Sequence, residues 1–115
     1  MAAQVHDPDD AKLVTLSKAT RARNGAAEGA AVRDLDGRTY TASTVELSTL
    51  QLSALSLAVA MAVSSGARGL EAAAVVTATD DVRADDVAVV RELAGTGVQV
   101  IRADVAGAVQ SISST

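Results

Sequence analysis

The sequence predicts a single α/β domain over residues 1–115, in which helices pack against a mixed sheet of about four or five strands. Two observations predict this class. Segments with the apolar spacing of helices alternate with short runs rich in valine and alanine, and a β-hairpin signal precedes this alternation. The element order read along the chain is α-β-β-α-β-α-β, and 115 residues suffice for one domain.

The first helix is predicted from residue 8 to about residue 23. Asp7 is a typical N-cap, Pro8 is favoured at the first helical position, and Gly25 is a typical stop. Residues 1–6 precede this helix, and we expect them to be frayed.

A hairpin and an uncharged helix are predicted next. Residues 28–33 and 38–44 are expected to be strands, joined by a turn in which Gly37 takes a positive φ. Residues 47–67 contain no charged side chain, and we interpret them as a central helix buried on most faces. Their high content of serine, threonine and glutamine argues against a membrane span.

Strands and helices are predicted to alternate in the rest of the chain. Residues 72–79 read as a buried strand, residues 81–93 as a helix with acidic residues in its first turn, and residues 98–102 as another strand. Residues 104–115 are weakly patterned and fit either a strand or a tail.

The composition excludes several classes of function. The chain has no cysteine and one histidine, His6, so disulfides, thiolate chemistry and a zinc site made of Cys and His ligands are excluded. A serine nucleophile activated by histidine is hard to build with His6 alone. The net charge of -4 argues against general binding to nucleic acid or to a membrane. No signal-peptide pattern is seen, and we expect a cytoplasmic protein.

Four short segments follow one another in a characteristic order. They are Gly29-Ala30-Ala31-Val32, then Asp36-Gly37-Arg38 with Tyr40, then Thr44-Val45-Glu46-Leu47, and a helix from Ser53 to Gly66. With the element order, they resemble the cytidine deaminase family, which includes cytidine and blasticidin S deaminases. The resemblance extends from Asn24 to about Leu93 and implies a cytidine-deaminase-like fold.

The resemblance also implies where the chemistry of that family would lie. The family binds zinc through a Cys or His that opens the long helix and through two Cys of a Pro-Cys-x-x-Cys segment, and a Glu transfers protons to the zinc-activated water. The corresponding residues here are Ser53, Arg83 and Asp86 for the ligands and Leu55 for the glutamate. Neutral serine is a poor zinc ligand, and leucine cannot transfer a proton. We therefore expect no catalytic residue, no bound metal and no cofactor.

The nucleoside-binding Asn and Glu of the family correspond to Thr44 and Glu46, which keep a hydroxyl and a carboxylate for ribose contacts. A structural role for Glu46, next to the start of the following helix, is the alternative. Arg83 and its acidic neighbours likewise read as the start of a helix, with a hard-cation site as the alternative. We expect Leu55 to fill the former active-site space and Arg83 to pair with a nearby acid.

These observations leave three functional hypotheses. The first is a catalytically inactive homologue that acts by self-assembly or by binding a partner, and the alternative is a nucleoside- or nucleotide-binding module. An active deaminase conflicts with the residues present. We expect a homo-oligomer, a tetramer first and a dimer second, because one sheet can cover only one face of the uncharged helix. The expected interface residues are Leu50, Ala54, Ala58, Met61 and Ala62.

Overall fold

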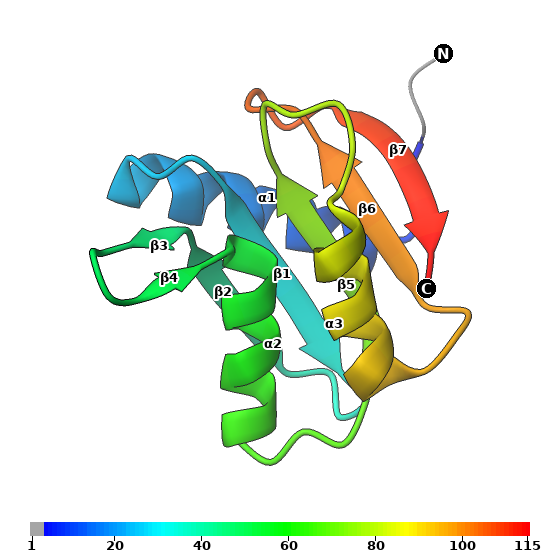
Figure 1. Cartoon of the computed structure of the whole chain (residues 1–115). Helices are drawn as coiled ribbons and strands as arrows, with labels where there is room; N and C mark the ends of the chain where they lie inside the picture. Colours follow the sequence, from blue (N-terminus) through cyan, green and yellow to red (C-terminus); the bar gives the residue numbers. More distant parts are fainter. Residues whose placement is uncertain (1–3) are drawn as a thin grey trace.

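A computed structural model describes residues 4–115, and within that range the chain forms one main sheet, a small ribbon and three helices (Figure 1). The sheet has the strand order β2-β1-β5-β6-β7, in which β5 and β6 are parallel and the other neighbours are antiparallel. The elements are α1 (Pro8–Asn24), β1 (Gly29–Asp34), β2 (Thr39–Ser43), β3 (Val45–Glu46), β4 (Gln51–Leu52), α2 (Ala54–Ser64), β5 (Leu70–Val76), α3 (Ala84–Ala94), β6 (Gln99–Ala103) and β7 (Val109–Ser114).

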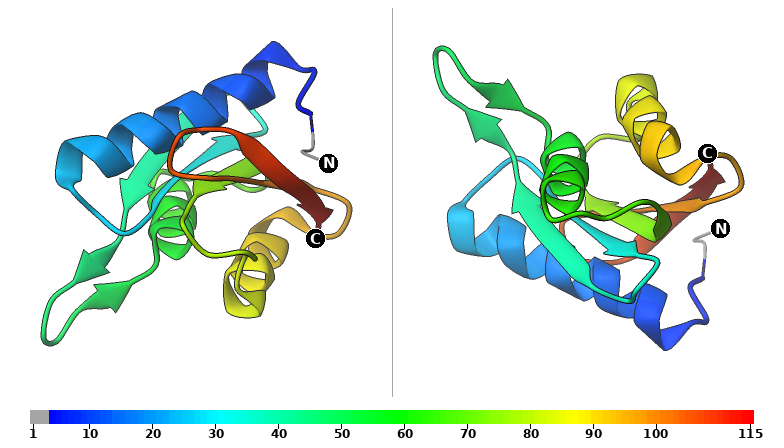
Figure 2. Two further views of the ribbon diagram at one scale, coloured as in Figure 1. Left: turned by 90° about the horizontal axis from the view of Figure 1, so that it is seen from above. Right: turned by 90° about the horizontal axis from the view of Figure 1, so that it is seen from below.

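The helices cover both faces of the sheet and make three layers (Figure 2). Successive strand residues point to opposite faces. Ala31 therefore packs with Leu13 on the α1 side, whereas Ala30 and Val32 pack with α2 on the other side. The predicted mixed sheet of four or five strands is confirmed.

Small residues let the helices approach the sheet closely. A side chain at Gly29 in β1 would collide with the backbone carbonyl oxygen of Ser17 in α1. On the opposite face, Ala58 of α2 is fully buried against the sheet. The abundance of alanine is thus explained by close packing within one chain.

The first helix and the hairpin agree with the sequence prediction. The Asp7 carboxylate caps α1 by accepting a hydrogen bond of 2.8 Å from the Asp9 amide, and Gly25 ends the helix at φ 59°. Gly37 has φ 84° in the turn between β1 and β2.

The predicted helix over residues 47–67 is wrong for its first part. There the chain forms a ribbon in which β3 pairs antiparallel with β4, and α2 begins only at Ala54. The ribbon forms because apolar and polar residues alternate with a period of two on both sides of Ser48 and Thr49. Ser53 then starts the helix by accepting a hydrogen bond from the Ser56 amide.

Several elements in the second half also differ from the prediction. The strand expected over residues 72–79 is β5, which runs from Leu70 to Val76 and ends where the Thr77 hydroxyl accepts a hydrogen bond from the Thr79 amide. The helix α3 begins at Ala84 and not at residue 81, because the backbone of Arg83 is still extended. Residues 104–115, which fitted a strand or a tail, contain β7, which pairs with β6.

Residues 1–3, part of the segment expected to fray, lie outside the described residues. Val5, in the same segment, is partly buried against the core on the α1 side. None of the described helices is long and apolar enough to cross a membrane.

Candidate functional site

A pocket of about 500 Å³ lies between the β3–β4 ribbon, the start of α2, the end of β5 and the start of α3. It brings together five of the residues that the sequence singled out. They are Thr44, Glu46, Ser53, Arg83 and Asp86, and Glu28 lies among them. Because α2 and α3 both begin here, the positive ends of their dipoles lie at this pocket.

Ser53 and Asp86 join the two helix starts. The Ser53 hydroxyl donates a hydrogen bond of 2.6 Å to Oδ1 of Asp86, whose side chain is 9% exposed. The same Ser53 oxygen accepts the Ser56 amide at 3.1 Å. Ser53 is therefore engaged both as the cap of α2 and as the link to α3.

Arg83 supplies the positive charge in the pocket lining. Its Nη2 lies 3.0 Å from Oε1 of Glu28 and 3.3 Å from Oδ2 of Asp86. The guanidinium side chain is half exposed, whereas both carboxylates are nearly buried. The expectation that Arg83 pairs with a nearby acid is confirmed for Asp86. The part played by Glu28 was missed, because it precedes Arg83 by 55 positions and no local pattern links them.

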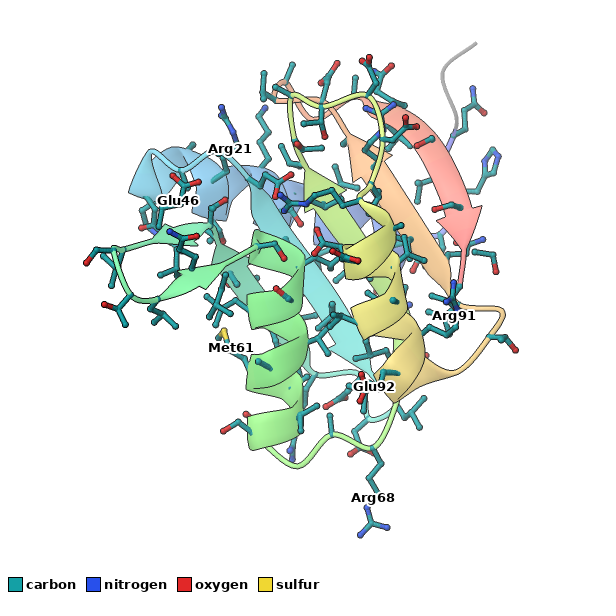
Figure 3. The ribbon with its side chains drawn as sticks, in the orientation of Figure 1. Arg21, Glu46, Met61, Arg68, Arg91 and Glu92 are labelled. Atoms are coloured by element: carbon teal, nitrogen blue, oxygen red, sulfur yellow. The ribbon has the colours of Figure 1, made fainter. Side chains whose placement is uncertain are left out.

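Thr44 and Glu46, the two residues expected to contact ribose, differ in whether their polar groups are already hydrogen-bonded within the chain. The Thr44 hydroxyl accepts a hydrogen bond of 2.9 Å from the Glu28 amide and donates one of 3.4 Å to the Glu28 carbonyl, so it joins β1 to the end of β2. Glu46 is exposed on the ribbon (Figure 3). Of the two, Glu46 is the one free to contact a ligand.

Leu55 does not occupy the pocket, and that expectation is wrong. The side chain is fully buried in the core between α2 and the sheet and does not line the pocket. An apolar side chain is more stable in that core than among carboxylates. The pocket therefore remains open.

Three of the five expected interface residues are also wrong. Ala54, Ala58 and Ala62 are fully buried within the chain itself, since they form the stripe of α2 that faces the sheet. Leu50 and Met61 are exposed and available to another molecule.

The donor set at this pocket does not fit a zinc ion. The three positions that the resemblance assigns to zinc ligands carry a hydroxyl already bound to a carboxylate, a guanidinium, and a carboxylate paired with that guanidinium. A fixed positive charge repels a divalent cation, and a neutral hydroxyl is a weak zinc ligand. Within residues 4–115 no group of three His, Cys, Asp or Glu side chains could hold a metal ion.

Comparisons with known proteins agree on one family. A family model described as "Cytidine deaminase-like" matches residues 6–107. No curated protein matches the sequence. The cytidine deaminase of Burkholderia pseudomallei superposes with a TM-score of 0.79 at 24% identity, covering 96% of this chain and 93% of that one. The cytidine deaminase of Mycobacterium tuberculosis gives 0.70 at 26% identity, covering 82% and 85%, and that of Mycobacterium leprae gives 0.68 at 23% identity, covering 86% and 89%.

Proposed function

This chain belongs to the cytidine deaminase-like family, and we propose that it is a single-domain, cytoplasmic, non-catalytic member that acts by assembling with copies of itself or by binding a partner protein. The observation that carries the proposal is the network of Ser53, Asp86, Arg83 and Glu28 in the pocket. These groups satisfy one another, and three of them, Ser53, Arg83 and Asp86, are the residues that the resemblance assigns to the zinc-ligand positions.

The chemistry of deamination supports this proposal. Zinc deaminases attack the base with a metal-activated water, and a glutamate transfers the protons. The residue that the resemblance assigns to that glutamate is Leu55, which has no ionisable group and lies in the core. The positive charge in the pocket lining is the guanidinium of Arg83, which, unlike a metal ion, has no coordination position for a water molecule.

Metal analysis of the purified protein tests the proposal. We expect no stoichiometric zinc in the unmodified chain, even after incubation with the metal. The matched control is the triple variant Ser53→Cys, Arg83→Cys and Asp86→Cys, which replaces the network by thiolates and should take up zinc. Stoichiometric zinc in the unmodified protein would overturn the proposal. A triple variant that takes up none would show instead that the three positions are misassigned.

Binding of a nucleoside is the second candidate, and the open pocket favours it. A volume of about 500 Å³ is in the range of small-ligand sites. Four carboxylates and one cation line the pocket, so an uncharged nucleoside should bind in preference to a phosphorylated one. The lining charges are Glu28, Glu46, Asp85 and Asp86 against Arg83.

Calorimetry tests this second candidate. We expect cytidine to bind more tightly than cytidine monophosphate, and Glu46→Gln to weaken cytidine binding by about tenfold, the effect of one lost hydrogen bond to a charged group. The exposed position of Glu46 makes this variant safe for folding. Equal binding of cytidine to both proteins, or no binding at all, would remove nucleoside recognition from the account.

A further inference from the structure

The strand β7 lies at one edge of the main sheet, and within residues 4–115 no strand pairs with its outer side (Figure 1). The other edge strand, β2, has α1 and α2 packed against it, whereas β7 packs chiefly against β6. An open edge strand can pair with a strand of another molecule, and proteins commonly protect such edges with charged residues or proline. Residues 105–115 contain neither, so the edge of β7 is unprotected.

The hydrogen bonds between β7 and β6 determine which backbone groups of β7 point to the open edge. The Thr115 amide donates a hydrogen bond of 2.9 Å to the Val98 carbonyl. Hydrogen-bonded positions alternate along an antiparallel pair, so Ser113 also turns its amide and carbonyl toward β6. Ile112 and Ser114, the residues on either side of Ser113, therefore point their amides and carbonyls to the open edge.

The side chains of β7 define the chemistry of a strand that suits this edge. Val109 and Ile112 lie on the α1 side of the sheet, where they are only partly buried against the core. Ser113 lies on the opposite face and is exposed. A complementary strand therefore needs an apolar side chain beside Ile112 and small, uncharged side chains on its other face. The strand β7 itself has this pattern.

A second copy of the chain supplies such a strand. When two β7 strands run antiparallel about a twofold axis at Ile112, the two Ile112 side chains lie opposite each other and Ser111 lies opposite Ser113. The open amides and carbonyls of the two strands then face each other. Each copy carries a net charge of -4, and two acidic molecules repel each other least where charge is absent, as it is in residues 105–115.

We propose that two copies join edge to edge through β7, so that their sheets continue into each other across a twofold axis. This inference rests on the self-assembly in the proposed function and adds to it the surface and the mode of contact. No residue of β7 lines the pocket between α2 and α3. Edge-to-edge assembly therefore leaves the pocket open to a ligand.

Removal of one open amide tests the pairing. Ser114→Pro deletes an amide hydrogen that β6 does not use, and the matched control Ser114→Ala deletes the hydroxyl but keeps that amide. Ser114 is exposed, so the fold can accommodate both side chains. Because the twofold axis brings two such amides into the interface, Ser114→Pro should weaken self-association by about 30-fold. Sedimentation velocity from micromolar to millimolar concentration measures this loss, and Ser114→Ala should associate like the unmodified protein.

Hydrogen exchange of the unmodified protein provides a test that needs no variant. The Ile112 amide should exchange at least tenfold more slowly at about 1 mM protein than at about 10 μM, whereas the amides of β2, at the other edge of the sheet, should exchange equally at both concentrations. An unmodified protein that stays monomeric throughout would overturn self-assembly and this inference together. Association that Ser114→Pro leaves unchanged would overturn this inference alone. The same holds for an associating protein in which exchange of the Ile112 amide does not depend on concentration.

Discussion

Replacement of Asp86 by alanine should destabilise the fold far more than replacement of its neighbour Asp85. Both carboxylates lie in the first turn of α3, where each gains about 0.3–1 kcal/mol from the helix dipole. Asp86 in addition accepts the Ser53 hydroxyl at 2.6 Å in a nearly buried position. A hydrogen bond to a charged group contributes about 1.5–3 kcal/mol. The ion pair with half-exposed Arg83 adds little, because solvent screens it.

The free energy of unfolding should therefore fall by about 1.5–3 kcal/mol more in Asp86→Ala than in Asp85→Ala. Urea denaturation followed by circular dichroism measures this difference. A double-mutant cycle of Asp86→Ala with Ser53→Ala separates the hydrogen bond from the lost cap of α2, and the coupling should be about 1–2 kcal/mol. Equal destabilisation by the two aspartate variants, together with zero coupling to Ser53, would refute the reasoning.

Three further predictions concern the rest of the fold. Gly29→Ala should lower the free energy of unfolding by about 3 kcal/mol, because the new side chain would collide with the backbone of α1. Gly69→Ala should lower it by less than about 1 kcal/mol, because its new side chain meets only the side chain of Leu35, which can move aside. Urea denaturation of both variants measures these two losses. Burial opposes ionisation of Asp34, but hydrogen bonds from the Tyr40 hydroxyl and from the Arg38 and Asp36 amides outweigh burial and lower the pKa of Asp34. The stability that the ionised carboxylate adds is therefore present above the ordinary aspartate pKa and is lost as the pH falls through the lowered pKa. The difference in unfolding free energy between the unmodified protein and Asp34→Asn should narrow from about pH 5 to about pH 2. The hydrogen bond to Asp34, followed by burial, raises the pKa of Tyr40, so the stability that this hydrogen bond adds should be lost as the pH rises through the raised Tyr40 pKa. Tyr40 is the one tyrosine in the chain, so ultraviolet absorbance follows its ionisation directly. The midpoint should lie above about pH 10 and move to lower pH in Asp34→Asn.

Local signals in the sequence were sufficient to predict α1 and the β1–β2 hairpin. The two ends of α1 are set by local features, namely Asp7 and Pro8 at its start and Gly25 at its end. Gly37 likewise sets the hairpin turn locally, through its positive φ. The ribbon carries no comparable signal. Its alternation lasts for only two residue pairs inside an uncharged segment, so a buried helix and a strand are equally compatible with the pattern.

The pocket was predictable in part, because several of its residues sit at element ends that the family order locates. Ser53, Arg83 and Asp86 were placed together by that order, and the structure brings them into contact. Glu28 was not found, since its pairing with Arg83 depends on how two distant segments meet.

The sequence also did not show whether the small residues of α2 face the sheet or another molecule. A stripe of alanines at helical spacing suits a sheet and a partner helix equally well. The structure assigns Ala54, Ala58 and Ala62 to the sheet, and of the expected interface residues Leu50 and Met61 remain exposed.

The release of ammonia from cytidine tests the central claim most directly. The unmodified protein, incubated at micromolar concentration with added zinc, should release no ammonia above the buffer blank. The reason is that Leu55 and Arg83, the residues that the resemblance assigns to the catalytic glutamate and to a zinc ligand, can neither transfer a proton nor bind the metal. Multiple turnovers that a chelator abolishes and zinc restores would contradict the claim, and the protein would then be an active deaminase.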